Sequence, residues 1–201
     1  MTFYLARHAN KEKGDFFNTS LRHQDEPISA EGQATARKLA DRFAGIPIAA
    51  IYVSAYRRTG QTAAELARRL DITPVCDGRI NEIDNGLFDG MSEQQLREAY
   101  PAEWSAYLAR NADFRFPEGE TGQEAANRIA AFIEEKRLQH GDRNVLIVSH
   151  EGLIRTWMCC LMGLPVYRRG EFRVDFCGLL EMEYMKEYER WKLIRFNQAC
   201  A

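Results

Sequence analysis

The stretch Asn144-Val145-Leu146-Ile147-Val148-Ser149-His150-Glu151-Gly152 decides the fold of this chain. Its four consecutive apolar residues predict a strand over 144–149 that is buried on both faces, as strands inside parallel sheets are. A largely apolar helix is predicted directly afterwards over 153–162, where Gly163 and Pro165 end it. A buried strand that leads through a short polar turn into a helix is half of a βαβ unit, so the stretch predicts an α/β fold.

The rest of the chain repeats this alternation of strands and helices. Apolar runs predict strands over 2–6, 48–53 and 73–76. Helices are predicted between them, the first from the N-cap Ser29 to about residue 45, because apolar residues recur there at helical spacing. Residues 179–185 and 191–196 predict a closing hairpin. We therefore predict a three-layer α/β/α sandwich with a mainly parallel sheet and a terminal antiparallel hairpin.

Residues 77–121 depart from the alternation. Glycines break this stretch into loops, and capping boxes at Ser92 and Thr121 begin two helices, the first of which Pro101 interrupts. No linker rich in Gly, Ser or Pro divides the chain. We therefore predict one domain over 1–201 with a small cap insertion at about 77–121.

Composition narrows the class of protein. The 201 residues carry a net charge of −2 and a pI of about 6.1, which argues against general binding to nucleic acid or to an anionic membrane. No signal peptide opens the sequence, and no apolar run approaches the ~20 residues that span a bilayer. The scattered cysteines are typical of reduced thiols (Cys76, Cys159, Cys160, Cys177 and Cys200). We expect a cytoplasmic protein without nucleic-acid or membrane partners, and the composition assigns no oligomeric state.

Basic side chains follow three of the predicted strands. Arg7 and His8 come directly after the first strand, Arg58 comes shortly after the second, and His150 follows the strand over 144–149. In open α/β sheets, ligands bind outside the carboxyl ends of the strands. Arginine forks match phosphate oxygens, whereas their fixed charges repel a metal cation. The pattern predicts an oxyanion site with no metal.

Five segments in order along the chain resemble the signature of the histidine phosphatase (phosphoglycerate-mutase-like) superfamily. They are Leu5-Ala6-Arg7-His8-Ala9, Ser54 followed by Arg58-Thr59-Gly60-Gln61-Thr62-Ala63, Asn81-Glu82-Ile83-Asp84-Asn85-Gly86, Gly119-Glu120-Thr121 with Arg128, and Val148-Ser149-His150-Glu151-Gly152. The resemblance spans about 4–155. The chain departs from the family pattern at Ala9, where Gly is usual, and at Lys11, which lacks the hydroxyl that often contacts phosphate in relatives.

The resemblance implies a phosphatase that forms a phosphohistidine and needs no metal or other cofactor. It assigns His8 as the nucleophile and Glu82 as the general acid and then the general base. The phosphoryl oxygens would be held by Arg7, Arg58 and a protonated His150. The predicted substrate-binding residues are Arg7, Arg58, His150, Asn10 and Gly152.

The resemblance leaves several functions open. Residues 114–128 resemble the sugar-phosphate and broad-specificity branches, which implies a small phosphorylated metabolite as substrate. Arg7-His8-Ala9 followed by Lys11 resembles the protein phosphohistidine phosphatases instead, although those proteins are usually shorter and lack the segment around Glu82. A phosphoglycerate mutase is a further alternative. A non-catalytic phosphate-binding module would be expected to lack His8 or Glu82, and both are present.

The run after Glu82 bears on the choice between phosphatase and mutase. Residues 83–89 hold two acids and no base. Mutases of this superfamily carry a basic run there, and an anionic diphosphoglycerate would meet like charge. We therefore expect a hydrolase that accepts an ester with a neutral or apolar body, against which Leu87 and Phe88 would pack.

Overall fold

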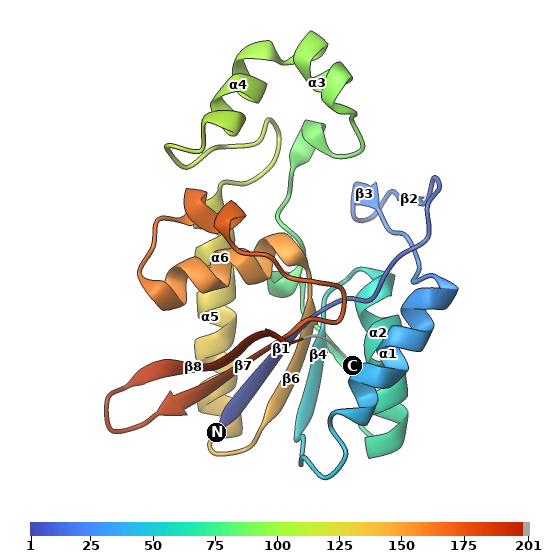
Figure 1. Cartoon of the computed structure of the whole chain (residues 1–201), viewed down its shortest axis with the longest axis vertical. Helices are drawn as coiled ribbons and strands as arrows, with labels where there is room; N and C mark the ends of the chain where they lie inside the picture. Colours follow the sequence, from blue (N-terminus) through green and yellow to red (C-terminus); the bar gives the residue numbers. More distant parts are fainter. Residues whose placement is uncertain (199–201) are drawn as a thin grey trace.

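The computed structural model describes residues 1–198, which fold into a central sheet between two layers of helices (Figure 1). The six strands lie in the order β5-β4-β6-β1-β7-β8. Pairs from β5 to β1 are parallel, whereas β7 runs antiparallel to both β1 and β8. The strands are β1 Thr2–Arg7, β4 Ala50–Val53, β5 Val75–Cys76, β6 Val145–Ser149, β7 Leu179–Met185 and β8 Arg190–Gln198. The predicted α/β sandwich with its mainly parallel sheet and terminal hairpin is confirmed.

Strand β6 shows why the two helical layers form. All five of its residues are buried. Val145 and Ile147 belong to the core shared with α5 and α6, whereas Leu146 and Val148 belong to the core shared with α1 and α2. Because successive side chains point to opposite faces of a sheet, a run of apolar residues requires helices on both sides. These helices are α1 Ala30–Asp41, α2 Arg57–Leu70, α5 Gly122–His140 and α6 Glu151–Met162.

The predicted helix starts are present. Ser29 caps α1 by accepting from the backbone N–H of Gly32, and Thr121 and Glu124 form the capping box of α5. The predicted second strand begins at Ala50 rather than at residue 48. Ile48 is buried, so packing explains its apolar character without strand pairing.

Residues 77–121 lie beyond the carboxyl edge of the sheet, where α3 (Glu93–Ala99) and α4 (Pro101–Ala109) stand at the top of Figure 1. Two short 3₁₀ helices precede them, η1 Gly78–Ile80 and η2 Gly86–Phe88. Pro101 opens α4, where a missing N–H costs nothing, so the predicted interruption is confirmed.

An aromatic cluster forms the interior of this segment. The ring of Phe88 lies 5.7 Å from that of Phe116 and 5.8 Å from that of Phe114. Phe88 is only 7% exposed. The expectation that Phe88 packs against the substrate is therefore wrong, because its ring is taken up by the core of its own segment.

Two elements were not expected from the sequence. A hairpin of β2 (Phe17–Asn18) and β3 (His23–Gln24) lies in a stretch for which no strand was predicted. A 3₁₀ helix, η3 (Val166–Glu171), follows α6. Both are short and mostly polar, so neither produces a periodic apolar pattern. Cys76, Cys159 and Cys160 are free thiols, and Cys200 lies outside the described residues.

Candidate active site

The ends of three parallel strands meet at one edge of the sheet. Arg7 at the end of β1 lies opposite Ser149 at the end of β6, and Val53 of β4 lies opposite Val148. A cavity of about 360 Å³ opens at this edge. Its lining includes Arg7, His8, Lys11, His23, Gln24, Glu26, Tyr56, Arg58, Glu82 and Glu151.

His8 is a buried imidazole with a fixed orientation. Its Nδ1 lies 2.8 Å from the carbonyl oxygen of Ala9. A carbonyl can only accept a hydrogen bond, so Nδ1 carries the proton and Nε2 keeps a free lone pair. Burial and then the nearby Arg58 guanidinium lower the pKa of His8 to about 3. The ring therefore has the charge and the tautomer that an attacking nitrogen needs.

Arg58 is held beneath this cavity. It is 6% exposed, it donates to Glu26 Oε2 at 3.3 Å, and its guanidinium lies 4.3 Å from the centre of the Tyr56 ring. Its neighbour Arg57 has a side chain that is 50% exposed and pairs with Asp25. Consecutive residues of a helix point about 100° apart, which is why one arginine faces the cavity and the other faces solvent.

Arg7 supplies a second guanidinium. It donates to the carbonyl of Val174 at 2.6 Å and lies 3.1 Å from a carboxylate oxygen of Glu151. Its guanidinium stacks 4.0 Å from the centre of the Phe176 ring. Among residues 1–198, the buried Nε atoms of Arg7 and Arg58 have no hydrogen-bond partner. The cavity thus has two permanent positive charges with unused donors.

His150 is fully buried between these groups, and its protonation state differs from the one expected. Arg58 donates to its Nδ1 at 3.3 Å, so Nδ1 is an acceptor and the proton sits on Nε2, which lies 2.8 Å from Ser54 Oγ. Burial, and then the neighbouring His8 and Arg58, hold the pKa of His150 well below its ordinary value. The predicted protonated form is therefore not the one found here, because a guanidinium already occupies the ring nitrogen that would carry the extra proton.

The carboxylate of Glu82 sits at the start of α6. Its oxygens accept from the backbone N–H groups of Gly152 at 3.1 Å, Leu153 at 3.0 Å and Ile83 at 2.9 Å. A Cβ on Gly152 would lie 2.6 Å from Glu82 Oε1, so only glycine leaves room for the carboxylate. Gly152, for which substrate binding stays a prediction, thus contacts Glu82.

Arg128 of α5 holds the loop that carries Glu82. Its guanidinium donates to the carbonyl of Asn81 at 2.9 Å and to that of Glu82 at 3.0 Å, and it pairs with Glu120 at 2.6 Å. Two carbonyl groups of this loop are therefore tied to one helix. The resemblance includes Glu120 and Arg128 but assigns them no role. Their contacts indicate one, because they hold the loop that positions Glu82.

The β2–β3 hairpin covers one side of the cavity. His23 lies 3.1 Å from Asp84 and 2.9 Å from Asp89, and its side chain is only 12% exposed. The hydrogen bond that His23 donates to Asp89, together with the charges of both carboxylates, raises the pKa of His23. The acids of the 83–89 run therefore contact an imidazole whose protonated form they favour, and that form offsets part of the like charge that the sequence predicts for an anionic substrate.

Asn10 and Lys11, in the loop that follows β1, have different surroundings. Lys11 lines the cavity and pairs with Glu26. Asn10, for which substrate binding stays a prediction, donates to Glu31 at 2.9 Å. Within residues 1–198, no three His, Cys, Asp or Glu side chains gather in a way that could hold a metal ion, and no helix is long and apolar enough to cross a membrane.

Comparison with known proteins agrees with this geometry. The model of the histidine phosphatase superfamily (branch 1) matches residues 3–199. Phosphoserine phosphatase 1 of Hydrogenobacter thermophilus is 31% identical over 98% of this chain and 92% of its own. A protein of Enterobacter sp. (strain 638) named probable phosphoglycerate mutase GpmB is 29% identical over 91% of this chain and 85% of its own.

Solved structures share the fold. The mycobacterial glucosyl-3-phosphoglycerate phosphatase superposes with a TM-score of 0.82 at 22% identity, covering 98% of this chain and 99% of that one. The α-ribazole phosphatase of Shigella flexneri superposes with a TM-score of 0.83 at 20% identity, covering 98% and 96%.

Proposed function

The chain belongs to the histidine phosphatase superfamily (branch 1) and is a phosphatase, and we propose that it hydrolyses small phosphate monoesters through a phosphohistidine at His8, without a metal. One observation carries the proposal. The His8 ring is neutral and bonded through Nδ1 to Ala9, which leaves Nε2 as the attacking atom beside two arginines. Attack by Nε2 on phosphorus forms the N–P bond as the ester P–O bond breaks.

In the proposed reaction, Arg7 and Arg58 hold the transferring phosphoryl group. Phosphoryl transfer depends mostly on positioning and on neutralising the charge of the equatorial oxygens. Two guanidinium groups with unused buried donors supply that charge, which is the task of a metal in other phosphatases. Neutral His150 acts through Arg58, whose orientation it helps to fix.

Glu82 is the proposed proton donor and acceptor. It lines the cavity that contains His8, and backbone amides of α6 fix its carboxyl group. A proton from Glu82 would neutralise the leaving alkoxide, and the resulting carboxylate would then take a proton from the water that attacks the phosphohistidine.

Residues 77–121 are proposed to be a cap within a single domain. Their elements stand over the edge of the sheet where β1 and β6 end, and the 83–89 loop within them meets the β2–β3 hairpin through His23. A cap in this place would shield the phosphohistidine from bulk water and contact the body of the ester.

A substrate panel tests the proposal. The protein should release phosphate from several monoesters, should lose this activity in His8→Ala, and should keep it in the presence of a chelator. Activity that disappears on chelation and returns with a divalent ion would contradict the metal-independent mechanism.

A separate assay tests the mutase alternative, because one relative is named a probable phosphoglycerate mutase. 3-Phosphoglycerate is supplied with and without 2,3-bisphosphoglycerate, and 2-phosphoglycerate and free phosphate are followed separately. We expect phosphate release; efficient formation of 2-phosphoglycerate without matching phosphate would overturn the hydrolase assignment.

A further inference from the structure

An ion pair between Lys11 and Glu26 lies in the wall of the cavity that contains His8. Glu26 is only 8% exposed. Its Oε1 contacts the Lys11 ammonium, and its Oε2 accepts from Arg58 at 3.3 Å. One buried carboxylate is therefore shared between two of the cations that line the cavity.

Two other carboxylates of the lining are held in a different way. Glu82 accepts from backbone amides of α6. Glu151 is divided between Arg7 and Arg155. Glu26 differs from Glu82 and Glu151 because each of its oxygens contacts a cation that itself lines the cavity. A phosphoryl group that enters this cavity must therefore compete with Glu26 for positive charge.

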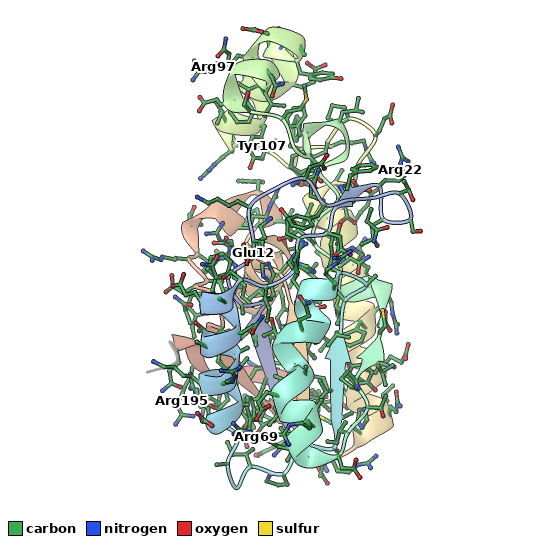
Figure 2. All side chains as sticks on the ribbon, turned by 90° about the vertical axis from the view of Figure 1, so that its right-hand side faces the viewer. Glu12, Arg22, Arg69, Arg97, Tyr107 and Arg195 are labelled. Atoms are coloured by element: carbon green, nitrogen blue, oxygen red, sulfur yellow. The ribbon has the colours of Figure 1, made fainter. Side chains whose placement is uncertain are left out.

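The backbone of Lys11 is fixed, whereas its side chain has room to turn. Lys11 forms an antiparallel bridge with Ile28, and the N–H of Glu12 donates to the carbonyl of Pro27 at 2.9 Å. Figure 2 shows Glu12 at the level between the top of α1 and the cap. The Lys11 side chain is 38% exposed, and an ammonium on a four-carbon stem can rotate toward a new acceptor. Lys11 can thus leave Glu26 without any movement of the loop.

The charge of Lys11 already reaches the imidazole of His8. Burial and then Arg58 are the main causes of the lowered pKa of His8, and Arg7 and Lys11 add to them. The transferring phosphoryl group must lie beside the same imidazole. A cation that acts on His8 from the cavity wall is therefore also close to the phosphoryl oxygens.

We propose that a bound phosphoryl group displaces Glu26 from Lys11, so that Lys11 becomes a further ligand of the phosphoryl oxygens and Glu26 promotes release of the product phosphate. The proposal rests on the proposed function, because it places the phosphoryl group at His8. Lys11 then adds a third cation to Arg7 and Arg58. After hydrolysis, the carboxylate of Glu26 repels the phosphate dianion and competes with it for Lys11. The lysine raises the affinity for phosphate, and the glutamate lowers it.

Calorimetry with inorganic phosphate tests both parts of the proposal. Lys11→Met removes the ammonium but keeps an unbranched side chain, and the Kd for phosphate should rise about tenfold or more, as expected for a charged hydrogen bond. Lys11→Arg keeps the charge and should stay within about threefold of wild type. Glu26→Gln keeps the shape of the side chain without its charge, and it should bind phosphate at least about threefold more tightly.

The opposite signs exclude a purely structural role for the pair. Lys11→Met and Glu26→Gln both remove the same ion pair, so a structural contact would make them shift phosphate affinity in the same direction. In the Glu26→Gln background, Lys11→Met should cost more affinity than it costs in wild type, because Lys11 no longer has to leave a carboxylate. If Glu26→Gln does not fold, unchanged phosphate affinity in Lys11→Met overturns the proposal by itself.

Hydrolysis of p-nitrophenyl phosphate gives a second readout. KM should rise in Lys11→Met, and free phosphate should become a stronger inhibitor in Glu26→Gln. The matched controls are Lys13→Met and Glu12→Gln, which change exposed side chains outside the cavity lining and should leave phosphate affinity within about twofold. Weaker phosphate binding in Glu26→Gln than in wild type, or equal changes in the controls, would refute the displaced ion pair.

Phosphate binding is measured without turnover, so failure of this proposal can be told apart from failure of the proposed function. If the wild type binds phosphate but hydrolyses no ester, the function fails, and the variants still decide the role of Lys11. If turnover disappears in His8→Ala while Lys11→Met and Glu26→Gln leave phosphate affinity unchanged, the function stands and the displaced ion pair is refuted. Orthovanadate replaces phosphate where phosphate binds too weakly to measure.

Discussion

The carboxyl edge of the sheet and the cap hold their side chains in different ways. At the edge, each candidate catalytic group is fixed by buried polar contacts, such as His8 to Ala9 and His150 to Ser54. In the cap, side chains rest on aromatic packing: the Tyr107 ring lies 5.7 Å from that of Phe114 and 5.5 Å from that of Phe116. We infer that the edge aligns atoms for phosphoryl transfer, because buried polar contacts hold its side chains in place.

Glu82 should show the largest effect among substitutions on the edge other than that of His8. Glu82→Gln removes a transferable proton, so kcat/KM for an alkyl phosphate should fall by about 10²–10⁴. p-Nitrophenyl phosphate, whose leaving group barely needs a proton, should lose far less. Steady-state kinetics on both esters measure this, with the exposed Glu118→Gln as the control. Equal losses on the two esters would remove Glu82 from proton transfer.

Gly152→Ala should reproduce part of that effect without touching a functional side chain. The added Cβ would lie 2.6 Å from Glu82 Oε1, so the carboxyl group must move. We expect kcat on the alkyl phosphate to fall by about 10–10². Gly60→Ala in α2 is the matched control, since nothing lies within 4 Å of its added Cβ. Full activity in Gly152→Ala would show that the position of Glu82 is unimportant.

Arg58 and Arg57 offer a smaller and sharper contrast within one helix. Arg58→Ala removes a buried guanidinium that faces His150, whereas Arg57→Ala removes a half-exposed one. We expect Arg58→Ala to lower kcat/KM at least about tenfold more than Arg57→Ala does. The reverse order would mean that the other arginine binds the phosphoryl group.

The smallest expected effect lies where the hairpin meets the cap. The pKa of His23 is raised, and that of Asp89 is lowered chiefly by its hydrogen bond to His23. The charged contact therefore persists above the lowered pKa of Asp89 and disappears as pH rises through the raised pKa of His23. The His23 ring also lies 6.4 Å from the Tyr56 ring. The positive charge of Lys11 contributes to the lowered pKa of Asp89.

Thermal unfolding of His23→Gln measures that contact. Its Tm should lie about 2–4 °C below wild type near pH 6, and the gap should close by pH 9. Arg22→Gln, which removes the neighbouring pair with Glu118, is the control, because an arginine keeps its charge over this range. A gap for His23→Gln that stays constant with pH would contradict the ionic contact.

The contrast between the edge of the sheet and the cap also explains which features the sequence could predict. The strands and the groups that directly follow them are local: an apolar run ending in Arg7 and His8, or in His150, is visible in a few residues. The fold class, the terminal hairpin and both capping boxes are confirmed for that reason. Each depends on contacts between near neighbours or on one regular pattern.

What the sequence did not predict depends on distant partners. His23 belongs to no predicted element, and it meets Asp84 and Asp89 only because the hairpin folds over the loop that carries these two acids. The neutral state of His150 depends on a donor from Arg58.

One measurement tests the central claim most directly. Labelled substrate is mixed rapidly with the protein, quenched without acid, and digested to locate the label. We predict a base-stable, acid-labile phosphoryl group on the peptide that carries His8, absent from His8→Ala, which should also lose turnover. A wild-type protein that turns over substrate with no labelled His8, or a His8→Ala protein with undiminished turnover, would contradict the account.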